Sequence, residues 1–299
     1  MAAVLLSGGT GLIGGALKIA LGGRGERIVQ LTRRDPASPD EVRWDPSAAA
    51  PLPDTTHLEG CTGAVHLSGA NLAAGRWSER YKRTIVASRV ESTRQLVRIL
   101  GALRNPPGVL LTASAVGIYG DRGDELLTED SAPGEGFLPD VCAAWEAAAE
   151  PVRELGIRLV QLRFGVVLTP NGGALRQMLP VFRAGLGGRL GDGRQWMSWI
   201  SLEDAVRAIT FALKEPSLAG ACNTTAPEPL TNAEFTRALG RRLHRPVVLR
   251  VPAFALRAAF GQMADDTVLA STRAVPSALQ STGFRFQHPR LEIALAAML

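Results

Sequence analysis

The chain has 299 residues, of which 46% are hydrophobic and 20% are charged, as is typical of a soluble globular protein. This length permits one large α/β domain or a domain with an added lobe. No apolar run approaches the length of a membrane span, and no basic segment precedes the first apolar residues, so we expect a cytoplasmic protein without a secretory signal.

The formal net charge is +5. The arginines are scattered among acidic residues, with no long basic run and few aromatic residues between them, so we expect neither a nucleic-acid partner nor a membrane partner. A solvated surface and a phosphate-bearing cofactor explain this charge better.

The three cysteines, Cys61, Cys142 and Cys222, are far apart in the sequence. Neither they nor the four histidines form a C-x-x-C or H-E-x-x-H motif. This pattern predicts reduced, buried thiols and no metal site.

A glycine-rich turn near the N-terminus carries the strongest motif. An apolar strand at 3–7 precedes it, and a helix is expected from 12 to about 21. Gly8, Gly11 and Gly14 have the G-x-x-G-x-x-G spacing of short-chain dehydrogenases, and Gly9 completes a G-x-G-x-x-G. Glycines allow a tight turn and a close approach to a pyrophosphate at the helix N-terminus. The order strand, glycine turn, helix therefore predicts a dinucleotide site.

Two arginines follow the second predicted strand, at 27–32. NAD-preferring sites usually place an acidic residue here for the ribose 2′-hydroxyl, but this chain has Arg33 and Arg34. They are either solvated loop residues or ligands of a 2′-phosphate. Because no acid occupies the end of the strand, we favour NADP(H) as the cofactor.

Strands and helices alternate over residues 1–168, with strands also expected at 63–67, 109–114 and 158–164. One long helix is expected to be capped by Ser78 and to run to about Leu103, and another to run from about Asp140 to Leu155. This alternation predicts a doubly wound parallel sheet, an α/β Rossmann domain spanning 1–168. Residues 169–299 are expected to form a smaller α/β substrate lobe. The lobe would include a tail from about residue 250. Segments at about 195–225 would return to the first domain, and one strand is expected at 196–200. Ser201 and Thr231 each resemble the start of a capping box.

Several further motifs are shared with a known family. The sequence resembles atypical, extended short-chain dehydrogenase/reductases of the NAD-dependent epimerase/dehydratase superfamily, within an epimerase-like subfamily. Some of its members are described as SulA-like cell-division inhibitors. The shared motifs span nearly the whole chain and are the glycine loop, Ser68-Gly69-Ala70-Asn71, Arg76-Trp77, Ser88-Arg89, Trp145-Glu146, Gly172-Gly173-Ala174-Leu175, Gly185-Leu186-Gly187-Gly188, Trp199-Ile200 and the tail from Pro252.

The resemblance also implies a set of cofactor contacts. Thr10, Leu12 and Ile13 would join the glycines at the pyrophosphate, and Thr32 and Arg33 would face the adenosine ribose and its phosphate. The other implied cofactor residues are Leu67, Ser68, Gly69, Arg89 and Val166. Arg89 is open to a second interpretation as a surface helix residue. Many relatives are dimers, so we expect either a monomer or a homodimer, with the helices from Ser78 and Asp140 as candidate contacts.

The chain departs from the superfamily in its catalytic residues. The usual catalysts are a tyrosine and a lysine four residues later, where the lysine lowers the pKa of the tyrosine. The only tyrosines here are Tyr81 and Tyr119, and neither has a lysine at that spacing. Ser114 matches the superfamily serine, and Tyr119 is the other weak catalytic candidate. Three hypotheses remain open: an NADP-dependent oxidoreductase acting on an unknown small carbonyl or alcohol substrate through other groups, an NADP(H)-binding regulator, and an ordinary nucleotide-sugar epimerase.

Overall fold

The protein is built on a seven-stranded sheet in which every pairing is parallel. The computed structural model describes residues 3–47 and 49–299. The sheet order is β12-β7-β5-β4-β1-β2-β3, so the chain winds outward from β1 in both directions. This is the doubly wound Rossmann arrangement expected from the sequence. Its strands are β1 (Ala3–Ser7), β2 (Arg27–Thr32), β3 (Glu41–Arg43), β4 (Cys61–His66), β5 (Val109–Ala115), β7 (Arg158–Phe164) and β12 (Gly220–Thr224).

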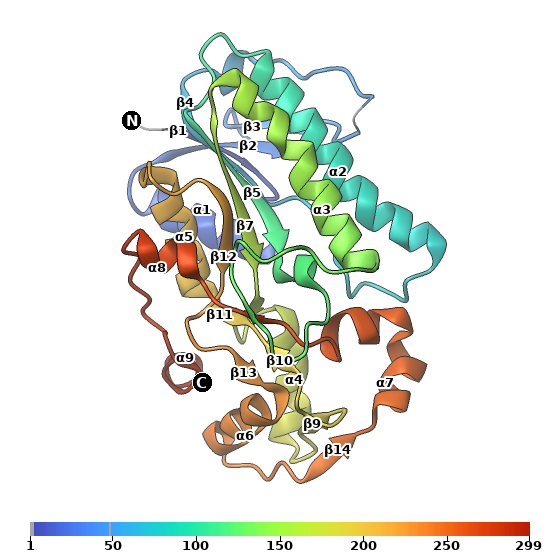
Figure 1. The fold of residues 1–299 in the computed structure, drawn as a ribbon. Coiled ribbons are helices and arrows are strands. Elements are labelled where there is room, and N and C mark those ends of the chain that lie inside the picture. The colour runs from blue at the N-terminus through green and yellow to red at the C-terminus, as the bar shows by residue number, and fades with distance from the viewer. Residues whose placement is uncertain (1–2, 48) are drawn as a thin grey trace.

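Helices cover both faces of the sheet. On one face lie α1 (Leu12–Gly22) and α5 (Leu202–Lys214), and on the other lie α2 (Glu79–Gly101) and α3 (Phe137–Ala149) (Figure 1). Successive residues of β1 point to opposite faces. Leu6 therefore packs in the core beneath α1 and α5, whereas Leu5 packs in the core beneath α2. Both are buried, which explains why this strand is a continuous apolar run.

The second half of the chain forms a smaller lobe beyond the carboxyl ends of the strands. It has its own apolar core, which includes Leu179, Phe235 and Leu295. Figure 1 shows this lobe below the sheet. Its main elements are β8 (Val166–Leu168), α4 (Gly173–Arg183), β9 (Gly188–Leu190), β10 (Trp196–Met197), β11 (Trp199–Ser201), β13 (Leu230–Thr231), α6 (Asn232–Leu243), β14 (Leu249–Val251), α7 (Ala253–Phe260) and α9 (Leu291–Met298).

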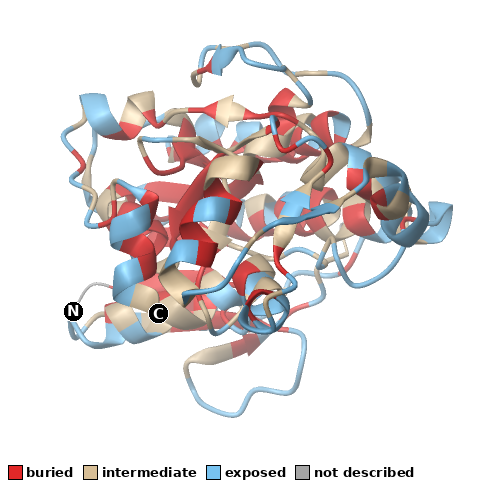
Figure 2. Cartoon of the chain, turned by 90° about the horizontal axis from the view of Figure 1, so that it is seen from below, coloured by how far each residue is buried: buried red, intermediate tan, exposed pale blue. Residues whose placement is uncertain are grey.

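Later segments return to the first part of the chain. β12 completes the large sheet beside β7, and β15 (Arg273–Ala274) pairs with β6 (Leu126–Leu127). In α7, the Ala258 carbonyl accepts a hydrogen bond from the Arg76 guanidinium at 2.8 Å. In Figure 2 the sheet forms a continuous buried centre between half-exposed helices. The division at residue 168 stays a prediction.

Two elements differ from the sequence expectations. The single strand expected at 196–200 is interrupted at Ser198, because β10 pairs with β13 whereas β11 pairs with β8. The helix expected from Asp140 to Leu155 begins earlier, at Phe137. It changes to a 3₁₀-helix over Glu150–Leu155, where Pro151 has no N–H to continue the α-helical bonding.

Both predicted helix caps are present, but only one is a full capping box. Thr231 and Glu234 bond each other's backbone reciprocally at the start of α6. Ser201 accepts from the Asp204 N–H at the start of α5, as expected. The Asp204 carboxylate instead accepts from the backbone N–H groups of Gln287 and His288, and so anchors the C-terminal tail to α5.

Candidate cofactor site

The glycine loop has a backbone geometry that requires glycine. Gly8 has a φ of +78°, and a Cβ there would lie 2.6 Å from the Leu67 carbonyl carbon. A Cβ on Gly14 would collide with the Gly8 carbonyl oxygen. The Gly11 N–H closes the turn on the same oxygen at 3.0 Å. Helix α1 has no side-chain cap, so its first N–H groups are left for another acceptor.

A cavity of about 510 Å³ opens beside this loop, where the strand order reverses. The end of β2, the loop after β4 and one face of α2 form its other walls. Its lining residues are Gly8, Gly9, Thr10, Gly11, Gln30, Leu31, Thr32, Arg33, Arg34, Trp44, Pro46, Leu67, Ser68, Gly69, Ala70, Thr84, Ser88 and Ser92. The position is the one at which doubly wound sheets bind ligands. The glycine turn and the size of the cavity fit a dinucleotide.

The cavity is electropositive at its β2 end. Arg33 and Arg34 line it and are exposed, and within residues 3–47 and 49–299 neither forms an ion pair with a carboxylate. The Arg34 N–H donates to Thr32 Oγ1 at 3.2 Å, which fixes the turn after the strand. No Asp or Glu is among the described residues that line this cavity. The site therefore has free guanidinium groups where an NAD-preferring site has an acid.

A neutral histidine supports the floor of the cavity. His66 is fully buried; its Nδ1 bonds Ser7 Oγ and its Nε2 bonds Ser92 Oγ at 3.2 Å. Burial lowers the pKa of His66 to about 4, so the ring is uncharged at neutral pH. These bonds tie together β1, β4 and α2, the elements that carry the cavity walls.

Arg89 lies behind the loop that follows β4. Its guanidinium donates to the carbonyl oxygens of Ala70 and Ile85 and stacks over the Trp145 ring, 5.1 Å from its centroid. Burial lowers its pKa. A Cβ on Gly69 would lie 3.4 Å from the guanidinium carbon, so Arg89 contacts the cavity wall from behind. This side chain is buried, which excludes the interpretation as a surface arginine.

The remaining predicted cofactor residues do not line the cavity. Gly14 packs against Gly8, Leu12 contacts Gly172, and Ile13 packs against the sheet core. Val166 lies on β8, paired with Trp199. The structure thus places Gly14, Leu12 and Ile13 in the support of the loop and Val166 in the second lobe. Their cofactor contacts stay predictions.

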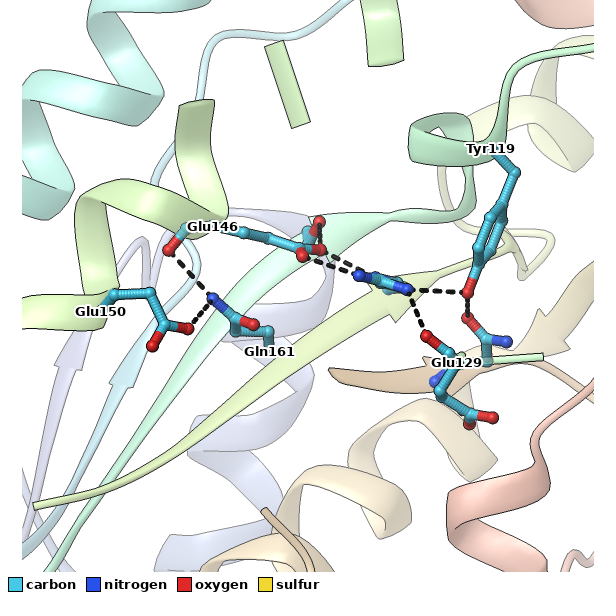
Figure 3. Close-up of polar contacts among 8 residues, drawn as sticks. Tyr119, Glu129, Glu146, Glu150 and Gln161 are labelled. Carbon is cyan, nitrogen blue, oxygen red and sulfur yellow. Dashed lines mark hydrogen bonds and ion pairs between the residues drawn. The ribbon is translucent and has the colours of Figure 1, made fainter. Parts of the chain in front are cut away.

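A second polar cluster lies at the carboxyl ends of β5 and β7, and we call it the Glu146–Arg163 cluster. Arg163 grips Glu146 with two bonds, Nε to Oε1 at 2.9 Å and Nη2 to Oε2 at 2.8 Å. Ser114 Oγ donates to Oε1 of Glu146 at 2.6 Å. On the other side, Arg163 Nη1 donates to the Tyr119 hydroxyl at 2.9 Å, and this hydroxyl donates to Asn223 Oδ1 at 2.7 Å. Figure 3 shows Glu146 and Tyr119 joined through this chain of contacts.

Comparisons with known proteins agree with this geometry. Residues 4–223 match the model of the NAD dependent epimerase/dehydratase family, and residues 251–298 match a domain of unknown function, DUF1731. Epimerase family protein Mb2239 of Mycobacterium bovis is 45% identical over 98% of this chain and 96% of its own length. The chain belongs to the NAD-dependent epimerase/dehydratase family.

Solved structures of relatives in this family have the same fold. Human epimerase family protein SDR39U1, solved with NADPH, is 33% identical with a TM-score of 0.91 over 99% of this chain and 98% of its own. A nucleoside-diphosphate sugar epimerase from Corynebacterium glutamicum is 34% identical with a TM-score of 0.80, over 100% of this chain and 58% of its own. The present protein is thus an NAD(P)-binding, epimerase-like short-chain dehydrogenase/reductase.

In this epimerase-family protein the two catalytic candidates lie in the Glu146–Arg163 cluster. Ser114 is 3% exposed and Tyr119 is fully buried. Burial raises the pKa of Tyr119, and its contacts with Arg163 oppose that rise only in part. Both hydroxyls have protein partners, and neither lines the cavity. Catalytic roles for them stay predictions.

The sequence reasoning did not identify the Glu146–Arg163 pair. A signal was present, because Arg163 stands between the apolar residues Leu162 and Phe164 of a strand, and a buried arginine needs a partner. Nothing in the sequence spacing showed that Glu146 on α3 would supply it. Glu146 lies one helix turn after Cys142 on α3.

The remaining expectations concern cysteines, metals and membranes. All three cysteines are buried, as predicted, and burial raises the thiol pKa to about 11 for Cys61 and about 12 for Cys142 and Cys222. In the described part of the chain, no group of three or more His, Cys, Asp or Glu side chains is arranged to hold a metal ion. No helix in that same part is long and apolar enough to cross a membrane.

Proposed function

We propose that this protein binds NADP(H) in preference to NAD(H) and is an NADP(H)-dependent oxidoreductase acting on a small carbonyl or alcohol substrate. One observation carries the proposal: Arg33 and Arg34 line the cavity without a carboxylate partner, and no described acidic residue lines it. A 2′-phosphate would supply the negatively charged partner that these guanidinium groups lack, whereas a 2′-hydroxyl is uncharged.

The residues of the chain divide the work of holding this cofactor. The N–H groups at the start of α1 would bind the pyrophosphate. The close packing of Gly8 against Leu67 would let the backbone of the turn approach it. Arg33 and Arg34 hold the 2′-phosphate. The bound cofactor supplies hydride transfer. The NADPH in the human relative supports this assignment.

The cofactor preference is tested by titrating the purified protein with NADPH and NADH, followed by fluorescence. We expect NADPH to bind about tenfold more tightly or better, a difference of about 1.4 kcal/mol. The double variant Arg33→Ala/Arg34→Ala should lose most of this preference while its NADH affinity stays within about twofold. Equal or tighter NADH binding by the unaltered protein contradicts the proposal.

The oxidoreductase activity is tested by anaerobic NADPH consumption with a panel of small carbonyl compounds, and nucleotide sugars are tested in parallel. If Ser114 and Tyr119 take part, Ser114→Ala and Tyr119→Phe should lower turnover by about 10²-fold or more without a matching change in NADPH affinity. Unchanged turnover in both variants rules these residues out. Epimerisation is redox-neutral, so conversion of a nucleotide sugar to its epimer without net NADPH consumption, followed by chromatography, favours the epimerase hypothesis.

A second candidate function is an NADP(H)-binding regulator that acts through a protein partner. The observation in its favour is that both candidate hydroxyls are buried and already bonded, Ser114 to Glu146 and Tyr119 to Asn223. Affinity capture with and without NADPH tests this function. A partner retained equally in both conditions contradicts control by the cofactor.

A further inference from the structure

A second cavity of about 360 Å³ adjoins the cofactor cavity. The two cavities share Arg33, Trp44 and Pro46, so these residues form the wall between them. The second cavity is lined by Arg33, Arg43, Trp44, Asp45, Pro46, Pro51, Leu52 and Pro53. Arg43 belongs to this cavity alone, and the dinucleotide motif does not include it.

The sheet register places Arg43 beside the arginines that follow β2. Arg43 is the last residue of edge strand β3, and its Cα is paired with that of Thr32, the last residue of β2. The next residue, Trp44, donates its N–H to the Thr32 carbonyl at 2.9 Å. Arg43 therefore ends its strand level with the point where Thr32 leads into Arg33, and both arginines line the same second cavity.

Arg43 forms an exposed ion pair whose loss costs little free energy. Its Nη1 lies 2.7 Å from Asp35 Oδ1, and the two side chains are 67% and 87% exposed. Exposed ion pairs of this kind stabilise a protein by only about 0–1 kcal/mol. A phosphate monoester carries more charge than one carboxylate and accepts a bidentate guanidinium contact. It can therefore take Arg43 from Asp35.

Two other acidic side chains at this edge of the sheet are bonded to backbone N–H groups. Asp45 accepts from the Ser47 N–H at 2.9 Å, and Glu41 accepts from the Ala37 N–H at 2.8 Å. Asp35 has no such backbone bond and pairs only with Arg43 among the described residues. The Asp35 carboxylate would repel an anion bound beside Arg33, and Arg43 between the two would offset this repulsion.

We propose that Arg43 is a second ligand of the cofactor 2′-phosphate, which it brackets with Arg33, and that the phosphate displaces Asp35 from Arg43 when the cofactor binds. Arg43 is then a specificity-determining residue for the phosphorylated adenosine. This inference rests on the proposed NADP(H) preference and adds a residue to it from a neighbouring strand.

The test uses the adenosine end of the cofactor alone. Calorimetry measures the affinity of the full-length protein for 2′,5′-ADP and for 5′-ADP, which differ only in the 2′-phosphate. We expect Arg43→Ala to weaken 2′,5′-ADP binding about fivefold to twentyfold and 5′-ADP binding less than about twofold. Asp35→Asn should keep or strengthen 2′,5′-ADP binding, because it frees Arg43 and removes a repelling charge.

Arg27→Ala is the matched control. Arg27 begins β2 and forms a 2.7 Å exposed ion pair with Asp40, but it lines neither cavity. It should leave both affinities within about twofold, since an exposed pair of this kind contributes little. Unchanged thermal melting of Arg43→Ala shows that the variant is folded.

The outcomes separate this inference from the proposed function. If Arg33→Ala weakens 2′,5′-ADP binding and Arg43→Ala does not, the role of Arg43 is wrong and the NADP(H) preference stands. An equal loss for both nucleotides in Arg43→Ala also overturns the role, as does a loss of 2′,5′-ADP affinity in Asp35→Asn. If the unaltered protein binds both nucleotides equally, the proposed preference fails as well.

Discussion

The cofactor cavity and the Glu146–Arg163 cluster use arginine in opposite ways. In the cavity, Arg33 and Arg34 are exposed and have no carboxylate partner among the described residues. In the cluster, Arg163 is buried, and its guanidinium bonds Glu146 twice and Tyr119 once. An arginine without a partner is available to a ligand, whereas a saturated one is committed to the fold. The cavity therefore has cationic groups available to an anion, whereas the guanidinium of the cluster is already paired.

The same contrast separates the candidate hydroxyls from the cofactor loop. Ser114 and Tyr119 lie at the ligand-binding edge of the sheet, but both hydroxyls already donate hydrogen bonds to other side chains of the protein. The glycine loop leaves backbone N–H groups at the start of α1 without a side-chain cap. Position at the correct edge of a sheet is therefore not enough to make a group available for chemistry.

The largest expected effect comes from breaking the closed cluster. Glu146→Gln leaves the Arg163 charge buried without its partner and should lower the free energy of unfolding by about 3–5 kcal/mol, measured by urea denaturation. NADPH affinity of the folded fraction should be unchanged, because no residue of the cluster lines the cavity. Glu125→Gln, which weakens a surface pair with Arg122 outside the cluster, is the control and should cost about 0–1 kcal/mol. Equal losses in the two variants would contradict the buried character of the cluster.

A second effect tests whether the floor of the cavity excludes charge. The pKa of His66 is lowered to about 4, from 6.5, so the unfolded chain binds more protons than the folded protein between these values. Stability is then complete above about pH 6.5 and falls by about 3 kcal/mol as the pH approaches 4.

The measurement for His66 is urea denaturation across this pH range, with His66→Asn as the test variant. That variant should lose this part of the pH dependence, whereas the control His57→Gln, at an exposed position, should keep it. An unchanged pH profile in His66→Asn would show that folding does not lower the pKa of His66.

The smallest of these effects concerns the shape of the open site. Gly14→Ala would collide with the Gly8 carbonyl oxygen, and we expect it to weaken NADPH binding about tenfold or more, or about 1.4 kcal/mol. Gly15→Ala is the control, because its Cβ meets nothing closer than 3.9 Å. It should keep cofactor affinity and stabilise α1 by about 0.5–1 kcal/mol. Fluorescence titration and thermal melting distinguish the two, and similar affinities would disprove the close approach.

Local sequence signals predicted much of the fold. The glycine spacing predicted the turn before α1, Ser78 was correctly expected to cap α2, and Thr231 formed the full box at α6. These features depend on neighbouring residues alone, so the sequence contains all the information needed. The interrupted strand at Ser198 was missed because its two halves pair with different strands, a choice made by distant segments.

The candidate site was predicted less evenly. The glycines and arginines that line the cavity came from motifs and spacing, because the backbone and charge requirements of a dinucleotide are local. Arg43 was not identified, since its place beside Thr32 depends on pairing across the sheet edge. The Asp204 carboxylate was assigned to a cap but binds the tail at Gln287 and His288, which are distant in sequence.

By itself, the sequence determined the doubly wound sheet, the dinucleotide turn and the absence of a tyrosine–lysine pair, because periodicity, glycine spacing and composition are properties of neighbouring residues. The tertiary structure alone decided which charged groups are available to a ligand and which are already paired within the protein. Glu146 and Arg163 meet only when α3 packs on the sheet, whereas no acidic residue among those the structure describes lines the cofactor cavity beside Arg33. The availability of a side chain depends on its partners in space, and these come from segments far apart in the chain.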